Sequence, residues 1–188
     1  MKVFQDKQTG VKIGLSFKVM FLFFMNHPRF IHDDRLVPDL FLARNPFDRA
    51  VSTFFEKCRA RVREPYFQKP QDAQVALMGA LRVKSVEALL GISFGEFCRV
   101  LPMVIDKDAH FIPQSAYPLP SRIVQIETGL PSLGKELDLD FTEKVNATDH
   151  LPACCYLDRE SAEIIRTLYA DDFVKLGYST EIYYDPKQ

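Results

Sequence analysis

Arg44 and Ser52 bracket the stretch of this chain that is best suited to chemistry. The apolar run 39–43 directly before Arg44 is typical of a strand, and the residues after it have the pattern of a helix. A helix N-terminus leaves amide N–H groups unpaired, and its dipole favours an anion. Arg44 would add a forked, permanently charged donor, and Ser52 a hydroxyl two turns further on. The pattern therefore predicts a phosphate site.

The helix that must position these side chains has clear start signals. Asn45 fits the N-cap and Pro46 fits the first helical position, and the helix is expected to run to Lys57. Apolar residues recur along it with a period near 3.6, which indicates one buried face. These residues are Phe47, Val51, Phe54, Phe55 and Cys58.

Strand and helix patterns alternate along the rest of the chain. This order predicts an α/β fold with a small parallel sheet flanked by helices and a helix-rich C-terminal half. Strands are expected at 1–5, 39–43 and 121–127. Helices are expected at 11–25, at 72–90 before Gly91, from the capping box at 93–96 to Pro102, at 130–139, and at 158–176 before Gly177.

The bulk composition is that of a soluble globular protein. The 188 residues predict a single domain, 1–188, and the chain is 47% hydrophobic and 26% charged. A net charge of −1 argues against a general affinity for nucleic acid or an anionic membrane. Basic residues concentrate in 44–69, which favours a small anionic ligand, although a solvated helix face would have the same pattern.

The cysteines and the apolar runs predict a cytoplasmic protein without a membrane span. No pair among the four cysteines has zinc-ligand or redox-motif spacing, so no metal site is expected and the thiols are interpreted as small hydrophobic residues in a reducing compartment. The apolar run 19–25 is too short to cross a bilayer, and no signal peptide is visible.

Segment 44–57, Arg-Asn-Pro-Phe-Asp-Arg-Ala-Val-Ser-Thr-Phe-Phe-Glu-Lys, resembles the 3′-phosphate-binding motif of sulfotransferases. Three further segments occur in the order of the carbohydrate-type branch, which includes the chondroitin and dermatan 4-O-sulfotransferases. They are Asp-Ala-His-Phe-Ile-Pro-Gln at 108–114, Val-Gln-Ile-Glu-Thr-Gly-Leu at 124–130, and Leu-Tyr-Ala-Asp-Asp-Phe-Val-Lys-Leu-Gly-Tyr at 168–178. Asn45 stands where the family usually has Asp.

The resemblance implies a P-loop-like sulfotransferase fold and an activity. The donor would be 3′-phosphoadenosine 5′-phosphosulfate (PAPS), and a sulfuryl group would move to a hydroxyl acceptor, with a saccharide expected. Arg44 and Ser52 take the positions that bind the donor's 3′-phosphate in the family. Arg49 is expected to brace the loop through acidic neighbours.

The family holds the 5′-phosphosulfate on a loop after its first strand, usually beginning Pro-Lys. Here the candidate loop contains Lys7, Thr9, Gly10 and Lys12 but lacks the proline. Lys7, or Lys12, would neutralise the leaving phosphate. There are two alternatives to a working loop. The segment is a plain surface turn, or the chain is shortened at its N-terminus and the loop is missing.

A general base must take the proton of the acceptor hydroxyl, and histidine is suited to this near neutral pH. His110 is the first candidate and His32 the second, while His27 and His150 remain open. A degenerate sulfotransferase fold that binds the nucleotide without turnover is the alternative function. A P-loop kinase is disfavoured because no Walker-type Gly-x4-Gly-Lys-Ser/Thr occurs.

Overall fold

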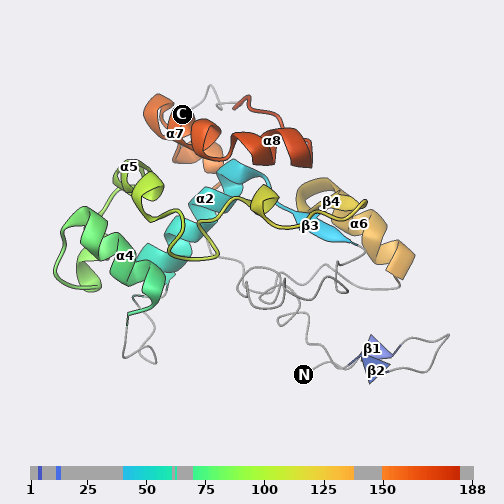
Figure 1. Ribbon diagram of the computed structural model, residues 1–188, viewed down its shortest axis with the longest axis horizontal. Helices are drawn as coiled ribbons and strands as arrows, with labels where there is room; N and C mark the ends of the chain where they lie inside the picture. The colour runs from blue at the N-terminus through green and yellow to red at the C-terminus, as the bar shows by residue number, and fades with distance from the viewer. Residues whose placement is uncertain are drawn as a thin grey trace.

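Two short parallel strands stand among helices in the computed structural model, which describes residues 4–5, 12–13, 40–60, 62, 70–137 and 150–182 (Figure 1). The strands are β1 Phe4–Gln5, β2 Lys12–Ile13, β3 Phe41–Ala43 and β4 Ile123–Gln125. The α-helices are α2 Pro46–Phe55, α4 Asp72–Leu81, α5 Phe94–Val104, α6 Ile126–Leu137, α7 Arg159–Leu168 and α8 Ala170–Leu176. Shorter helical turns are η2 Glu56–Ala60, η3 Glu87–Gly91, η4 Gln114–Ala116 and η5 Ala153–Cys155. The predicted α/β character with a small parallel sheet is confirmed at this coarse level.

β3 and β4 are the parallel pair, and each leads directly into a helix. Phe41 lies opposite Ile123 and Ala43 opposite Gln125, so both strands end at the same edge of the sheet. α2 follows β3 and α6 follows β4. The carboxyl ends of parallel strands are where open α/β sheets usually bind ligands, which places residue 44 at a favourable edge.

The start of α2 confirms the sequence prediction. The Asn45 Oδ1 accepts a hydrogen bond from the Phe47 N–H at 2.9 Å, and Pro46 occupies the first turn. The helix continues past Phe55 as the π-helical turn η2, in which hydrogen bonds skip one residue more than in an α-helix. Lys57 and Cys58 in this turn are both buried.

The core forms where α2 packs against α5 and α7, and Figure 1 shows α2 running beneath these two helices in this view. The Phe54 ring lies 5.5 Å from the rings of both Phe94 and Phe97, centroid to centroid, and Phe97 lies 6.2 Å from Phe111. Phe97 and Phe111 are completely buried. These contacts bury the predicted apolar face of α2, although Phe55 is only half-buried.

Two of the predicted helices are divided. The expected helix 72–90 ends at Leu81 because Arg82 adopts a left-handed conformation with φ 56°, and the chain turns helical again only in η3. The expected helix 158–176 is interrupted at Tyr169, where α7 ends, and α8 then runs to the predicted stop at Gly177 with φ 72°.

Two predicted boundaries are also wrong. Pro102 does not end α5, because it lies exposed near the end of a helix that runs on to Val104, where one missing hydrogen bond is tolerated. The capping box at Ser93 and Glu96 does start this helix, as predicted. The expected strand 121–127 is shorter, because α6 begins at Ile126 and takes Glu127 into its first turn.

The helix predicted at 11–25 is wrong at its start, which is the part that the structure describes. Lys12 and Ile13 belong to β2, which pairs antiparallel with β1, so the predicted helix 11–25 does not begin as a helix. The remaining residues of that segment lie outside the described part of the chain. Within the described ranges, no helix combines the length and apolar character that crossing a membrane requires.

The buried Arg49 of α2 joins this helix to the loop after α5 and to α8. Its guanidinium donates hydrogen bonds to the carbonyl oxygens of Ala109 at 3.2 Å and Ile112 at 2.6 Å, and lies 4.0 Å from the Asp172 carboxylate in α8. Asp172, which is 0% exposed, accepts hydrogen bonds from the backbone N–H groups of Gln114 at 2.9 Å and of Ser115 at 2.7 Å. This agrees with the expectation that Arg49 braces a loop through an acidic neighbour.

Replacing Asp172 should therefore destabilise the protein strongly. Asp172→Ala leaves the buried guanidinium without its negatively charged partner and two backbone N–H groups without their acceptor, and we expect a loss of about 3 kcal/mol in the free energy of unfolding, measured by urea denaturation. Asp171→Ala is the matched control, since Asp171 is exposed and pairs only with Lys175 at 2.7 Å. Its loss should stay within about 0.5 kcal/mol, and equal losses in the two variants would contradict the role of Asp172.

Candidate functional site at the end of strand β3

The Arg44 backbone is held at the end of β3 by one side chain. The Gln114 amide accepts from the Arg44 N–H at 3.0 Å and donates to the Arg44 carbonyl oxygen at 2.8 Å. Gln114 is only 2% exposed, so both hydrogen bonds are shielded from water. The direction in which the Arg44 side chain leaves the sheet is thereby fixed.

The Arg44 guanidinium carries a partly buried positive charge. Burial lowers the pKa of Arg44, and this effect outweighs the opposing influence of Asp48 and Glu127. Arginine nevertheless stays protonated in proteins. Burial therefore does not remove the proton but makes the charged guanidinium less stable than it would be in water. Within the described residues the guanidinium makes no hydrogen bond and no ion pair of 4 Å or less. An anion placed against it would offset part of that cost.

The N–H groups of Asn45 and Phe47 at the start of α2 are already used by the protein itself. The Asn45 side chain takes the Phe47 N–H, and the Glu127 Oε1 accepts from the Asn45 N–H at 2.7 Å. The Tyr178 hydroxyl lies 2.7 Å from the Glu127 Oε2 and 2.9 Å from the Ala43 carbonyl oxygen, and burial and Glu127 raise the pKa of Tyr178. The anion-binding capacity of this junction therefore resides in side chains more than in helix amides.

Ser52 lies on α2 and meets a histidine from a distant segment. Its Oγ is 2.8 Å from the Nε2 of His150, and the His150 Nδ1 is 2.7 Å from the Leu151 carbonyl oxygen. Ser52 is only 9% exposed, so this contact is largely shielded from water. The contact between His150 and Ser52 has no signal in the local sequence, because the two residues are 98 positions apart.

His110, the first candidate for the general base, lies in a mixed cluster of charges. Its Nδ1 is 2.5 Å from the Asp108 Oδ1, and its Nε2 is 3.5 Å from the Glu56 Oε2. The Lys57 Nζ lies 3.3 Å from the Glu56 Oε1 and 4.0 Å from the Asp108 Oδ1, and it is 2% exposed. Gln71 accepts a further hydrogen bond from Lys57 at 3.2 Å. Both ring nitrogens of His110 thus face carboxylates.

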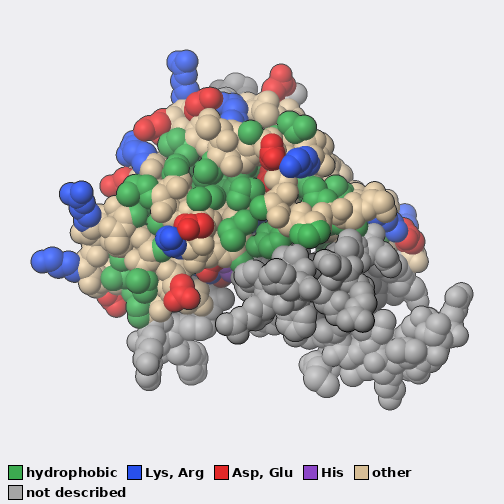
Figure 2. All heavy atoms as spheres, in the orientation of Figure 1, with side chains coloured by type: hydrophobic (Ala, Val, Ile, Leu, Met, Phe, Trp, Pro, Cys, Tyr) green, Lys and Arg blue, Asp and Glu red, His purple; other side chains and the backbone are tan. Residues whose placement is uncertain are grey.

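The basic residues of segment 44–69 that the structure describes do not form a single exposed patch. Arg49 and Lys57 are buried, and Arg59 donates to the carbonyl oxygens of Leu89 at 2.8 Å and Ile92 at 2.5 Å. Figure 2 shows positive and negative side chains interspersed around the visible face, with apolar side chains gathered over its middle. Among the described basic residues of 44–59, three are thus held by contacts within the protein, and Arg44 is partly buried at the end of β3.

The remaining predicted site residues can be placed only in part. Lys12 belongs to β2, and Lys7, Thr9, Gly10 and His32 lie outside the described residues. The predicted 5′-phosphosulfate loop therefore stays a prediction. In the ranges that the structure describes, no group of three or more His, Cys, Asp or Glu side chains is arranged to hold a metal ion.

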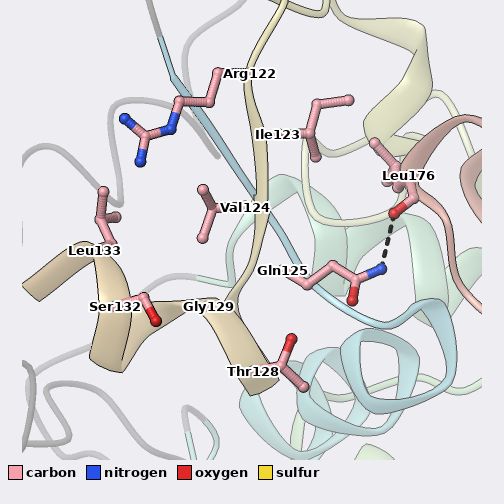
Figure 3. Close-up of a pocket in the computed structure, with 9 residues that line it drawn as sticks. All are labelled: Arg122, Ile123, Val124, Gln125, Thr128, Gly129, Ser132, Leu133 and Leu176. Carbon is pink, nitrogen blue, oxygen red and sulfur yellow. Dashed lines mark hydrogen bonds between the residues drawn. The ribbon is translucent and has the colours of Figure 1, made fainter.

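A hollow of about 340 Å³ lies between β4 and α6 (Figure 3). Arg122, Val124, Gln125, Thr128 and Ser132 are among the residues that line it. Figure 3 shows the Gln125 amide directed at the Leu176 carbonyl oxygen, which it reaches at 3.0 Å. None of the predicted site residues lines this hollow.

The chain has no significant match among the protein-family models, the curated proteins and the solved structures with which it was compared. The resemblance of its four segments to sulfotransferases therefore stays a prediction.

The pKa of Asp108 gives a pH-dependent test of the His110 cluster. Burial opposes the ionisation of Asp108, but the His110 hydrogen bonds and the Lys57 charge together outweigh it and lower the pKa. A carboxylate with a lowered folded-state pKa contributes stability that is complete above its unfolded pKa, about 3.9, and is lost as pH falls through the folded value. Asp108→Asn should therefore lower the free energy of unfolding most above about pH 5. The difference in this free energy between variant and parent should shrink below about pH 4.

Urea unfolding of both proteins across this pH range measures that difference. Asp106→Asn is the control, because Asp106 is 69% exposed and bonds only the neighbouring Lys107. A difference for Asp108→Asn that does not vary with pH would contradict the assigned charge interactions.

Proposed function

We propose that the protein is a PAPS-dependent sulfotransferase whose donor binds through Arg44 and Ser52. The observation that carries this proposal is the partly buried Arg44 guanidinium at the carboxyl end of β3, held in place by its backbone and without a direct acidic partner among the described residues. Such a group is suited to a phosphate, which accepts forked, charge-assisted hydrogen bonds.

The way the four family-like segments pack supports this reading. Segment 108–114 contributes Gln114, which holds Arg44, and segment 124–130 contributes Glu127, which accepts from Asn45. Segment 168–178 contributes Asp172, which holds Gln114, and Tyr178, which reaches Ala43. The residues that produce the resemblance in sequence thus form one connected unit around the β3–α2 junction.

In the proposed reaction, a new bond forms between the acceptor oxygen and sulfur while the bond from sulfur to the bridging oxygen of the donor breaks. The leaving group is 3′-phosphoadenosine 5′-phosphate. Catalysis of such a transfer rests on positioning and on electrostatic stabilisation of the leaving oxygen. We assign that stabilisation to Lys7, in a loop with Thr9 and Gly10 that precedes Lys12 of β2, on the sequence resemblance alone.

His110 remains the first candidate for the general base, ahead of His32. The Asp108 carboxylate at its Nδ1 would hold the ring so that Nε2 is available for proton transfer, as paired carboxylates do for catalytic histidines. The acceptor hydroxyl would have to replace Glu56 beside Nε2, which it faces at 3.5 Å. The acceptor is expected to be a carbohydrate hydroxyl.

The alternative is a nucleotide-binding protein of the same fold without turnover. It is favoured by the position of Glu56 beside His110, which occupies the face that an acceptor would need. Binding of the nucleotide is common to both functions, and transfer separates them.

The first test is the affinity for 3′-phosphoadenosine 5′-phosphate, measured by calorimetric titration. Arg44→Ala should weaken binding about 10- to 100-fold, because a hydrogen bond to a charged group contributes about 1.5–3 kcal/mol. Arg44→Lys should recover part of the loss, since lysine keeps the charge without the fork. Arg99→Ala is the control, because Arg99 is 52% exposed and pairs with Glu160 on the surface. If the parent protein does not bind, both functions are excluded.

The second test is transfer from radiolabelled donor to a panel of saccharides. Lys7→Ala and His110→Gln should each lower turnover, by about 10²- to 10⁴-fold for loss of a general base, while binding of 3′-phosphoadenosine 5′-phosphate is retained. Unchanged turnover in either variant removes that residue from the mechanism. A parent protein that binds the nucleotide but transfers nothing to any saccharide would favour the binding function.

A further inference from the structure

Ser52 and His150 form a hydrogen-bonded chain whose polarity can be read from the structure. The His150 Nδ1 lies 2.7 Å from the Leu151 carbonyl oxygen, which can only accept, so Nδ1 carries a proton. In a neutral imidazole the other nitrogen is then an acceptor. The Ser52 hydroxyl, 2.8 Å from Nε2, must therefore donate its proton to the ring.

The ring is fixed in this position from both sides. It stacks on Phe55 of α2 with centroids 5.2 Å apart and planes at 26°, and the Tyr156 ring meets it edge-on at 6.4 Å. Ser52 and Phe55 thus face the ring from α2, while Leu151 and Tyr156 face it from the segment around η5. Tyr156 is the titratable side chain among them, and its hydroxyl accepts from the Leu151 N–H at 3.1 Å.

While the imidazole is neutral, the hydrogen bond between Ser52 and His150 runs in the direction that leaves no donor for an anion. The single proton of the Ser52 hydroxyl points at His150, so Ser52 offers only lone pairs to a phosphate. A proton on Nε2 reverses the chain, because Nε2–H then donates to Ser52 Oγ and the serine proton becomes free to turn toward the phosphate. The imidazolium also adds a positive charge to that of Arg44.

We infer that His150 is a positioning residue of the phosphate site that acts through Ser52, and that the protein takes up a proton at His150 when the 3′-phosphate binds. The inference rests on the proposed function, because it needs a phosphate at Ser52. It goes beyond that function by assigning His150 to donor binding rather than to catalysis, and by making donor affinity depend on pH. Histidine is suited to this role because it gains its charge between about pH 5 and 8.

The test is calorimetric titration of 3′-phosphoadenosine 5′-phosphate at several pH values, in pairs of buffers with different heats of ionisation. This measures the number of protons taken up on binding. The parent should take up a proton through His150, and its affinity should fall by up to about tenfold per pH unit as the pH rises through the histidine titration. His150→Gln has a side-chain amide that can donate to Ser52 at every pH, so its uptake and its pH dependence should be smaller than those of the parent.

The phosphates of the ligand also titrate near pH 6, so the informative quantity is the difference between parent and variant. Ser52→Ala is a second variant that keeps the imidazole but removes the serine hydroxyl that it bonds. Its proton uptake on binding should also be smaller than that of the parent. Adenosine 5′-phosphate, which lacks the 3′-phosphate, should show no difference between parent and His150→Gln.

The outcomes separate this inference from the function on which it rests. Proton uptake that is larger in the parent than in either variant supports His150 as a positioning residue. Equal uptake in parent and His150→Gln overturns the inference and leaves the proposed function standing. A parent that does not bind the nucleotide at any pH overturns both.

Discussion

The buried guanidinium of Arg49 is the interaction on which the rest of this structure depends. It lies in the middle of α2, and it reaches the loop after α5 through two carbonyl oxygens and α8 through Asp172. A charge this deep in a protein is costly unless its partners are well placed, and its Nε in fact has none. The arrangement holds because Asp172 also serves two backbone N–H groups of the same loop. One carboxylate thus fixes the loop that in turn fixes Arg44.

The parts of the fold that follow from local chemistry could be predicted from the sequence. The Asn45 cap, the capping box at Ser93 and the stop at Gly177 depend on residues within a few positions of each other, and all three are found. The divisions at Arg82 and Tyr169 could not be predicted in this way. Tyr169 leaves the helix where its hydroxyl bonds the Phe111 carbonyl oxygen at 2.8 Å, a partner 58 residues away.

In the candidate site, too, the types of the residues could be predicted from the sequence but their arrangement in space could not. The types and spacing of Arg44 and Ser52 mark a phosphate site, but the sequence alone did not say which of the nearby cations are structural. Lys57 is chemically equivalent to an exposed lysine until the π-helical turn carries it into the core beside Glu56 and Gln71. Contacts such as that of Ser52 with His150, 98 residues apart, arise only from the packing of the segments.

Gln114 has a consequence for how this protein varies through evolution. Its amide must give one donor and one acceptor to the same residue, Arg44, at 2.8 and 3.0 Å. Glutamate offers no donor, leucine neither group, and asparagine is one methylene shorter, so few substitutions can preserve the pairing. Because both partners are backbone groups of residue 44, the pairing restricts the residue at position 114 and leaves the side chain at position 44 to be set by what the guanidinium binds. A glutamine 70 positions after Arg44 thus carries a constraint that belongs to the shape of the backbone and not to the chemistry of the arginine.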